Sequence, residues 1–483
     1  MSTSPDYLPG TQRPERKILL RLQRMEMALV RAHLAHPDAL ADEDYQCLRY
    51  VLNFARLDRF APFRDGGYID DVAVDQTIVG PFRVQVFHYL FDCLRNERDL
   101  RQRLYVAEQA VSKLAAGVTE FRKQVLSRHR NEFSAEELDR ELMNKVLVLI
   151  LGGGGGAGFV YTGAQERLRE SNHLPGYVVG ASIGALTGLF MASSPETAAR
   201  TNLEFAKNLE QKDVFSRPRI MPSHTMPGLM RLHLRALHQT FVKENGEPIR
   251  FKDLAIPFDI VVGGMRRKVY ERLPGDLTAP RLEASRSRRF NTRLAKAMWR
   301  MLAFLVPKAV REIVLGSHIL PDFRAVDAVG ISAAIPGILQ YSPDTVDERT
   351  EELIRGLREQ HDLAVLVDGG VANNVPARVA WRGVHEGRLG TRNAFYLAFD
   401  CFHPQWDRKH LWLWPVTRIV QLQMPANRPY LDWLIRFQPT LSPVNLLPLP
   451  AQLEQAFGWG HKQMDGDIAL VDKVLAPVTW HPK

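Results

Sequence analysis

Cysteine is scarce in this sequence of 483 residues, which contains only Cys47, Cys93 and Cys401. They are odd in number and far apart, so they form neither a disulfide framework nor the spaced ligand pattern of a zinc site. Long apolar runs are also missing. No stretch approaches the roughly 18 apolar residues of a membrane span, and residues 1–17 lack the apolar core of a secretory signal. We therefore expect a cytoplasmic or peripheral membrane protein with neither a signal peptide nor a transmembrane helix.

Neither the charge nor the apolar content of the chain is extreme. The composition is 45% apolar and 24% charged, which is typical of globular proteins and excludes a disordered chain. The formal net charge is +9, which favours partners with anionic surfaces, such as membranes, nucleic acids or phosphorylated substrates.

The first part of the chain, residues 1–143, is predicted to be a helical region because apolar residues recur at helical spacing among arginines and lysines. Ser134 and Glu137 form a capping box, which predicts a helix over Ala135–Lys145. The simplest interpretation is a set of helices packed on the next domain. A membrane-binding amphipathic helix over residues 16–35 is the alternative.

The pattern changes over residues 144–400. Short apolar strands alternate there with helical segments, which indicates an α/β fold with a mostly parallel sheet covered by helices on both faces. Two insertions interrupt this pattern near residues 209–250 and 274–322. The expected strands are Val146–Leu151, Gly176–Gly180, Phe258–Val262, Val269–Leu273, Leu363–Val367 and Phe395–Phe399.

Two later stretches have compositions that suit a membrane surface. Within the second insertion, residues 281–311 are rich in arginine and include the apolar run Met301–Val306. Such a helix is suited to lie on an anionic membrane or to act as a lid, and a solvated structural insertion is the alternative. Residues 401–483 hold six of the eight tryptophans and many prolines. We expect this extension to pack on the core, although tryptophan also suits a bilayer interface.

A glycine-rich loop, Leu151–Gly158 (LGGGGGAG), follows the first predicted strand and opens a helical segment. This geometry holds anions, because glycine allows close backbone approach and a helix start supplies free N–H donors. The loop also contains the G-x-G-x-x-G spacing of dinucleotide-binding folds. That hypothesis requires an acidic residue at the end of the second strand, where the sequence has Gly180–Gly184 (GASIG) instead. The loop is therefore assigned to an oxyanion.

The second predicted strand ends in a nucleophile-elbow pattern, Gly180-x-Ser182-x-Gly184. In this motif a strand turns sharply into a helix with the serine at the tip, so the positions two before and two after must be small. Glycine satisfies both positions. The helix that starts beside Ser182 also places its positive end near a developing oxyanion.

A serine hydroxyl needs a base, and Asp368 is the best-placed candidate. It follows the predicted strand Leu363–Val367, at the end where ligands gather in open α/β sheets. Gly369 and Gly370 leave space around its carboxyl group. The fifteen histidines offer no comparable candidate, since His361 lies at the wrong end of the same strand.

Together these motifs resemble the patatin-like phospholipase family. The resemblance rests on the glycine loop, on GASIG, on ISAAIPG (Ile331–Gly337) and on DGGVANNVP (Asp368–Pro376), in that order. It covers about residues 146–400.

The resemblance implies a three-layer α/β core and a serine esterase that cleaves carboxylic esters of phospholipids or related lipids. Ser182 would be the nucleophile and Asp368 the base, with an acyl-serine intermediate. Backbone N–H groups of Gly153, Gly154 and Gly155 would form the oxyanion hole. No cofactor or metal is implied. A lipid substrate and a membrane surface, preferably anionic, are the expected partners; nucleic acid is not, and the oligomeric state is left open.

One residue departs from the family pattern. Ala157 stands where the family usually has arginine or lysine, so the loop has one positive charge fewer. The alternative hypothesis is therefore a catalytically weak or inactive patatin-like protein that acts as a membrane-binding or regulatory module.

Overall fold

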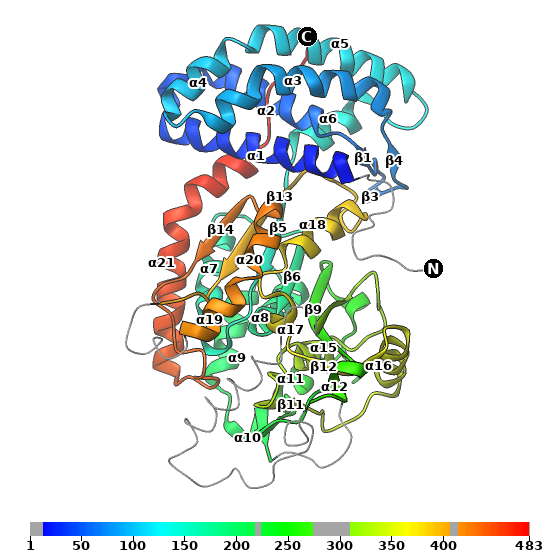
Figure 1. The fold of residues 1–483 in the computed structure, drawn as a ribbon, viewed down its shortest axis with the longest axis vertical. Helices are drawn as coiled ribbons and strands as arrows, with labels where there is room; N and C mark the ends of the chain where they lie inside the picture. Colours follow the sequence, from blue (N-terminus) through cyan, green and yellow to red (C-terminus); the bar gives the residue numbers. More distant parts are fainter. Residues whose placement is uncertain (1–12, 218–223, 274–309, 406–413, 483) are drawn as a thin grey trace. The chain divides into compact units, whose positions relative to one another are not determined.

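The structure is a computed structural model (Figure 1) that describes residues 13–217, 224–273, 310–405 and 414–482. The chain divides into two compact units. The three-part division predicted from the sequence stays a prediction, and the two units cut the chain at other points. Unit 1 comprises residues 1–147, 381–396 and 466–483, and unit 2 comprises residues 148–380 and 397–465.

Unit 1 confirms the predicted helical region. The capping box is present, since the Glu137 N–H donates to Ser134 Oγ at 3.2 Å and the Ser134 N–H donates to Glu137 Oε2 at 2.7 Å. Two short hairpins, β1–β4 and β2–β3, were not predicted. The elements are α1 (Arg13–Ala35), α2 (Asp42–Ala55), β1 (Arg59–Phe60), β2 (Phe63–Arg64), β3 (Gly67–Tyr68), β4 (Val72–Ala73), α3 (Gln76–Asn96), α4 (Leu100–Glu108), α5 (Val111–Arg128) and α6 (Ala135–Met143).

Helix α1 contains the stretch that could have been a membrane-binding amphipathic helix. Its apolar residues Leu22, Leu29 and Val30 are fully buried inside unit 1. Burial of this face stabilises the helical unit and favours the packing interpretation. None of the described helices combines the length and the apolar character needed to cross a membrane.

A buried ion network links α1, α2 and the start of the first long strand in unit 1. Glu26 accepts from Lys145 Nζ at 3.0 Å and from Arg56 at 2.9 Å, and Arg49 lies 3.6 Å away. Burial alone would raise the pKa of Glu26, but attraction by Lys145, Arg56 and Arg49 prevails and lowers it to about 2. The carboxylate is therefore ionised at neutral pH, and its partners depend on its charge.

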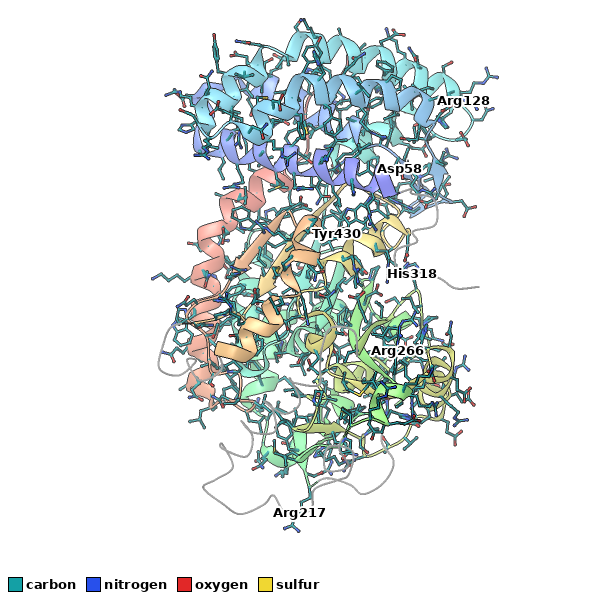
Figure 2. The ribbon with its side chains drawn as sticks, in the orientation of Figure 1. Asp58, Arg128, Arg217, Arg266, His318 and Tyr430 are labelled. Atoms are coloured by element: carbon teal, nitrogen blue, oxygen red, sulfur yellow. The ribbon has the colours of Figure 1, made fainter. Side chains whose placement is uncertain are left out.

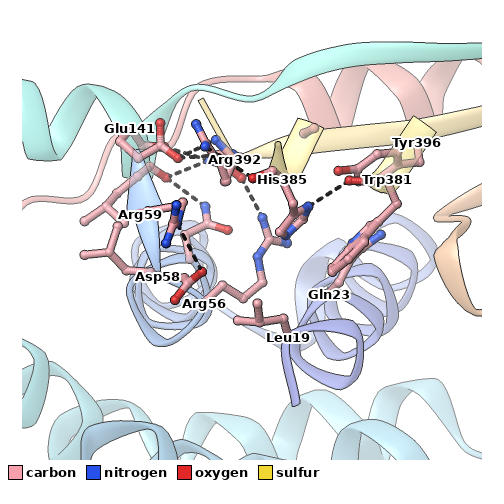
Figure 3. A pocket seen from close by; sticks show the side chains of 15 residues that line it. Leu19, Gln23, Arg56, Asp58, Arg59, Glu141, Trp381, His385, Arg392 and Tyr396 are labelled. Atoms are coloured by element: carbon pink, nitrogen blue, oxygen red, sulfur yellow. Dashed lines mark hydrogen bonds and ion pairs between the residues drawn. The ribbon is translucent and has the colours of Figure 1, made fainter. Parts of the chain in front are cut away.

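A small polar cavity lies in the same unit (Figure 3), with a volume of about 30 Å³. His385 stacks on Trp381 with ring centroids 3.6 Å apart, and Glu141 accepts the N–H groups of Arg392 and Asn393 at 2.9 and 3.1 Å. Burial raises the pKa of Glu141 to about 7 and lowers that of His385 to about 3. The volume suits about two water molecules rather than a metabolite.

The sheet of unit 2 has the order β10-β9-β6-β5-β13-β14, and β12 also pairs with β9. The pairs β5–β6, β6–β9 and β13–β14 are parallel, whereas β10 and β12 are antiparallel to β9. Helices flank the sheet, so the predicted mostly parallel α/β fold is confirmed. The strands are β5 (Val146–Leu151), β6 (Tyr177–Ala181), β9 (Phe258–Arg266), β10 (Val310–Gly316), β12 (Leu363–Val367), β13 (Ala394–Asp400) and β14 (Trp433–Arg436).

The strand predicted over Val269–Leu273 is wrong. Strand β9 instead continues to Arg266 and pairs along both edges, and the chain then turns into the short helix α12 (Arg267–Tyr270). Val269 and Leu273 pack in a cluster with Met265 and with Val365 and Val367 of β12, which explains their apolar character without a strand. Strands β10 and β14 were not predicted.

The remaining elements of unit 2 surround this sheet. A second small sheet has the order β11-β8-β7. The basic segment 281–311 and Trp406 and Trp412 lie largely or wholly outside the described residues, so the membrane or lid prediction stays a prediction. The elements are α7 (Val160–Glu170), α8 (Ile183–Ser193), α9 (Ala198–Lys207), α10 (Gln211–Val214), β7 (Phe215–Ser216), β8 (Met230–Leu232), α11 (Arg235–Thr240), α15 (Ala325–Ser332), β11 (Leu339–Tyr341), α16 (Glu348–Gln360), α17 (Gly369–Asn373), α18 (Ala377–His385), α19 (Trp414–Gln421), α20 (Met424–Asn427) and α21 (Pro450–Leu475), of which α18 and α21 continue into unit 1.

The ion network gives a stability prediction. Glu26→Gln should lower the free energy of unfolding at pH 7 by about 3–5 kcal/mol, because Lys145 and its arginine neighbours lose their buried counter-ion. A carboxyl group whose pKa is lowered by folding stabilises the folded state fully when the pH is above the pKa of the unfolded chain. The whole effect is therefore present at pH 7. Denaturant unfolding measures it, with the exposed Glu108→Gln as control. Equal stability of the two variants would contradict the prediction.

Candidate functional site

The site forms where two strands meet end to end along β9. Strand β10 occupies one edge of β9, so β6 and β12 share the other edge. Ala181 of β6 pairs with Val261, and Val367 of β12 pairs with Gly263. Because β6 is parallel and β12 antiparallel to β9, their carboxyl ends face each other. The next residue of each strand, Ser182 or Asp368, therefore lies at the gap between them.

Ser182 has the backbone conformation of a nucleophile elbow. Its φ is 55° and its ψ is −121°, which is a strained region for a residue other than glycine. The Ser182 N–H donates to Ser332 Oγ at 2.8 Å, and the Ser332 hydroxyl donates to the Val261 carbonyl at 2.7 Å. Ser332 thus fixes the elbow to β9. A Cβ at Gly184 would lie 2.1 Å from the Leu151 carbonyl oxygen, so the turn requires glycine there.

Asp368 is buried beside this elbow. Its Oδ1 accepts the Gly370 N–H at 2.8 Å, and its Oδ2 has no well-formed hydrogen bond to any described residue. Burial raises the pKa of Asp368 to about 6, although the Ser182 hydroxyl and the N–H groups of Gly370 and Val371 partly oppose that rise. The carboxyl group therefore faces Ser182 with the proton affinity of a general base near neutral pH.

The glycine loop passes close to Ser182, since a Cβ at Gly153 would lie 3.1 Å from Ser182 Cβ. The Gly153 N–H already donates to the Asn374 carbonyl at 3.1 Å. Among the backbone hydrogen bonds of the described residues, none uses the N–H of Gly154 or Gly155. Of the three donors predicted for an oxyanion hole, the structure therefore leaves Gly154 and Gly155 available.

Ala157 lies in a short 3₁₀ helix, Gly155–Phe159, that precedes α7. Its side chain is fully buried. An arginine or lysine at this position would have to be buried as well, which is costly without a partner. The donors of the loop come from the backbone, so the alanine removes none of them.

An apolar cavity of about 100 Å³ opens beside Ser182. The first predicted insertion, near residues 209–250, supplies much of its wall, a role that its polar composition did not indicate. Leu446 and Leu447, from the C-terminal extension, were also missed. The apolar lining includes Phe159, Ile183, Leu186, Phe205, Leu209, Val214, Phe215, Leu232, Leu234, Leu237, Val329, Ala333, Ile335, Leu339, Leu446 and Leu447.

Asn374 and Gln423 support the loops around the site, and neither role was predicted. Asn374 Oδ1 lies 2.7 and 2.8 Å from the Cβ positions of Gly153 and Gly370, between the two glycine-containing turns. Gln423 accepts the Asn374 N–H at 2.7 Å and donates to the Val371 carbonyl at 2.8 Å. The motif ends at Pro376, so a partner from residue 423 carries no local signal in the sequence.

The described histidines lie outside this site. His318 is exposed on unit 2 (Figure 2), and His403 bonds to the Phe437 carbonyl at 3.1 Å. The described part of the cavity lining contains no histidine. In the described part of the chain, no group of three or more histidine, cysteine, aspartate or glutamate side chains is arranged to hold a metal ion.

Comparison with known proteins agrees with the motifs. The model of the family described as patatin-like phospholipase matches residues 149–381, a range that includes the glycine loop, Ser182 and Asp368. The predicted resemblance is therefore confirmed. No curated protein matches the chain significantly. The residues from 382 onward, including β14, α21 and the two cavity leucines, lie outside the match.

The strained elbow gives a second prediction. Ser182→Gly should be more stable than Ser182→Ala by about 1 kcal/mol, because glycine adopts a φ of 55° without strain. Thermal unfolding of both variants measures the difference. Ser193, in the last turn of α8, is the control position. There the alanine variant should be more stable than the glycine variant, because glycine disfavours a helix. An alanine variant at Ser182 as stable as the glycine variant would contradict the strain argument.

Proposed function

Because the chain contains a patatin-like phospholipase domain, we propose that it cleaves carboxylic ester bonds of phospholipids or related lipids through an acyl-serine intermediate. The domain match indicates a lipid acyl hydrolase in general terms. The observation that carries the specific proposal is that Ser182, which lines an apolar cavity, lies beside the buried carboxyl group of Asp368. The net charge of +9 favours binding to an anionic membrane surface, and we propose that the protein takes its lipid substrate from such a surface.

In the first step, Ser182 Oγ attacks the ester carbonyl carbon and its proton passes to Asp368. A carboxyl group with a pKa near 6 is largely ionised at neutral pH and still accepts a proton. The carbonyl oxygen becomes an oxyanion. In this proposal the N–H groups of Gly154 and Gly155 and the start of α8 stabilise it.

In the second step, the bond between the carbonyl carbon and the leaving oxygen breaks, and the alcohol takes the proton from Asp368. The acyl group stays on Ser182. A water molecule then attacks this ester while Asp368 accepts one of its protons. Collapse of the second oxyanion releases the fatty acid and returns the proton to Ser182 Oγ. Every proton is shuttled by one carboxyl group, so no histidine is needed.

The proposal predicts how two substitutions affect hydrolysis. Ser182→Ala and Asp368→Asn should each lower fatty-acid release from phospholipid vesicles and from aryl esters by at least about a thousandfold, since nucleophile and base act as a unit. A fluorophosphonate reagent should label the native chain and not Ser182→Ala. Ser193→Ala is the control and should retain activity.

Two results would count against this assignment. Unchanged hydrolysis in either dyad variant would remove that residue from the reaction. A folded native chain that neither hydrolyses esters nor reacts with fluorophosphonate, yet binds anionic vesicles, would support the non-catalytic membrane module instead.

The burial of Asp368 also predicts that the group needed for activity lowers the stability of the fold. The rise of the Asp368 pKa from 3.8 to about 6 means that its ionised form costs roughly 3 kcal/mol in the folded state. This cost is complete above pH 6 and absent below the unfolded pKa. Asp368→Asn should therefore raise the free energy of unfolding at pH 8 and leave it nearly unchanged near pH 4. Denaturant titrations at both pH values test this, and a loss of stability at pH 8 would contradict it.

A further inference from the structure

A segment outside the family match, Ser442–Leu447, covers the glycine loop. The Gly156 N–H donates to the Pro443 carbonyl oxygen at 3.0 Å. A Cβ at Gly155 would lie 2.2 Å from the same oxygen, and a Cβ at Gly156 would lie 2.1 Å from the Asn445 carbonyl oxygen. Backbone therefore rests directly on backbone, and any side chain at either glycine would push the two segments apart.

The same segment brings two leucines to the cavity. Leu446 and Leu447 line it beside the loop, and Leu446 Cδ2 lies 3.3 Å from the Cβ position of Gly155. Residues between 159 and 339 form the other walls. An acyl chain attached to Ser182 would thus have the matched domain on one side and these two leucines on another.

An internal hydrogen bond and the start of α21 fix the position of the segment. Within it, the Asn445 N–H donates to the Ser442 carbonyl at 2.9 Å. The side chain of Gln452, in the first turn of α21, accepts from Asn445 Nδ2 at 3.1 Å and from the Leu449 N–H at 3.0 Å. These bonds hold the two leucines in one geometry instead of leaving them on a free loop.

Helix α21 in turn packs closely on α7, the helix that follows the glycine loop. A Cβ at Gly163 would lie 1.9 Å from the Phe457 carbonyl oxygen, and a Cβ at Gly460 would lie 1.8 Å from the Val160 carbonyl oxygen. Paired glycines allow the two helix backbones to approach each other this closely. The leucines are therefore anchored to the same helix as the loop.

We propose that Ser442–Leu447 is part of the substrate site and that Leu446 and Leu447 determine the length of the acyl chain that is accepted. The inference rests on the proposed hydrolysis through Ser182. The cavity of about 100 Å³ is smaller than the cavities of about 150 Å³ that hold a benzene molecule. Only the first carbons of a chain fit within it, so the size of a wall residue decides how much more can enter.

The test compares Leu447→Trp and Leu447→Ala on p-nitrophenyl esters from acetate to palmitate. Leu447→Trp should lower the ratio of kcat/KM for palmitate to that for acetate by about tenfold or more, and Leu447→Ala should raise this ratio, since small changes in an apolar pocket alter discrimination by such factors. Leu449→Trp and Leu449→Ala are matched controls, because Leu449 is 67% exposed and does not line the cavity. A ratio within about twofold of the native value in both Leu447 variants, or equal losses for all esters, would overturn the inference.

Binding of cis-parinaric acid, a fluorescent fatty acid, separates this inference from the proposed reaction. In the Ser182→Ala background, Leu447→Trp should weaken binding about tenfold or more, whereas Leu449→Trp should not. That result together with an inactive native chain would reject the reaction and keep the acyl site. Equal binding by both tryptophan variants would overturn the acyl site even if the native chain hydrolyses esters.

Discussion

The end-to-end pairing of β6 and β12 along one edge of β9 is the constraint on which the site depends. Neither strand alone places Ser182 against Asp368. Because the two strands run in opposite directions, their carboxyl ends point toward the same gap. Val261 and Gly263 of β9 pair with the last residues of β6 and β12 and so fix the register on either side of that gap. A slip of one residue in either pairing would reverse the side on which Ser182 or Asp368 emerges. The backbone hydrogen bonds of β9 therefore define how far apart Ser182 and Asp368 lie.

Both residues at this gap are held in states that are unfavourable in isolation. Ser182 has a positive φ, and Asp368 carries its charge in a buried setting. Neighbouring groups stabilise both states. Ser332 connects the elbow to β9 through two hydrogen bonds, and the Gly370 N–H donates to the Asp368 carboxylate. Strain and desolvation concentrate where the proposed chemistry takes place. The ion network around Glu26 shows the opposite case, in which three cations surround a buried carboxylate and stabilise its charge.

The sequence predicted what is encoded locally. The apolar strands before the glycine loop, before Ser182 and before Asp368 and the capping box at Ser134 each depend on neighbouring residues, and the structure has all four. It could not predict that β12 runs antiparallel to β9, because strand direction depends on distant pairing. The same reason explains the wrong strand at Val269–Leu273 and the unforeseen roles of Gln423 and Leu447, whose partners lie far along the chain.

The glycines of the loop Leu151–Gly158 have two possible reasons: free N–H donors and close backbone contact. A loop that only offers N–H donors to an oxyanion needs free backbone groups at Gly154 and Gly155. In this chain Gly155 and Gly156 also lie against the carbonyl oxygens of Pro443 and Asn445, so this contact by itself requires glycine at both positions. Ala157, in the same loop, is fully buried. The loop is thus positioned by backbone packing against the C-terminal segment, which gives a physical reason why it keeps its geometry without a cation at residue 157.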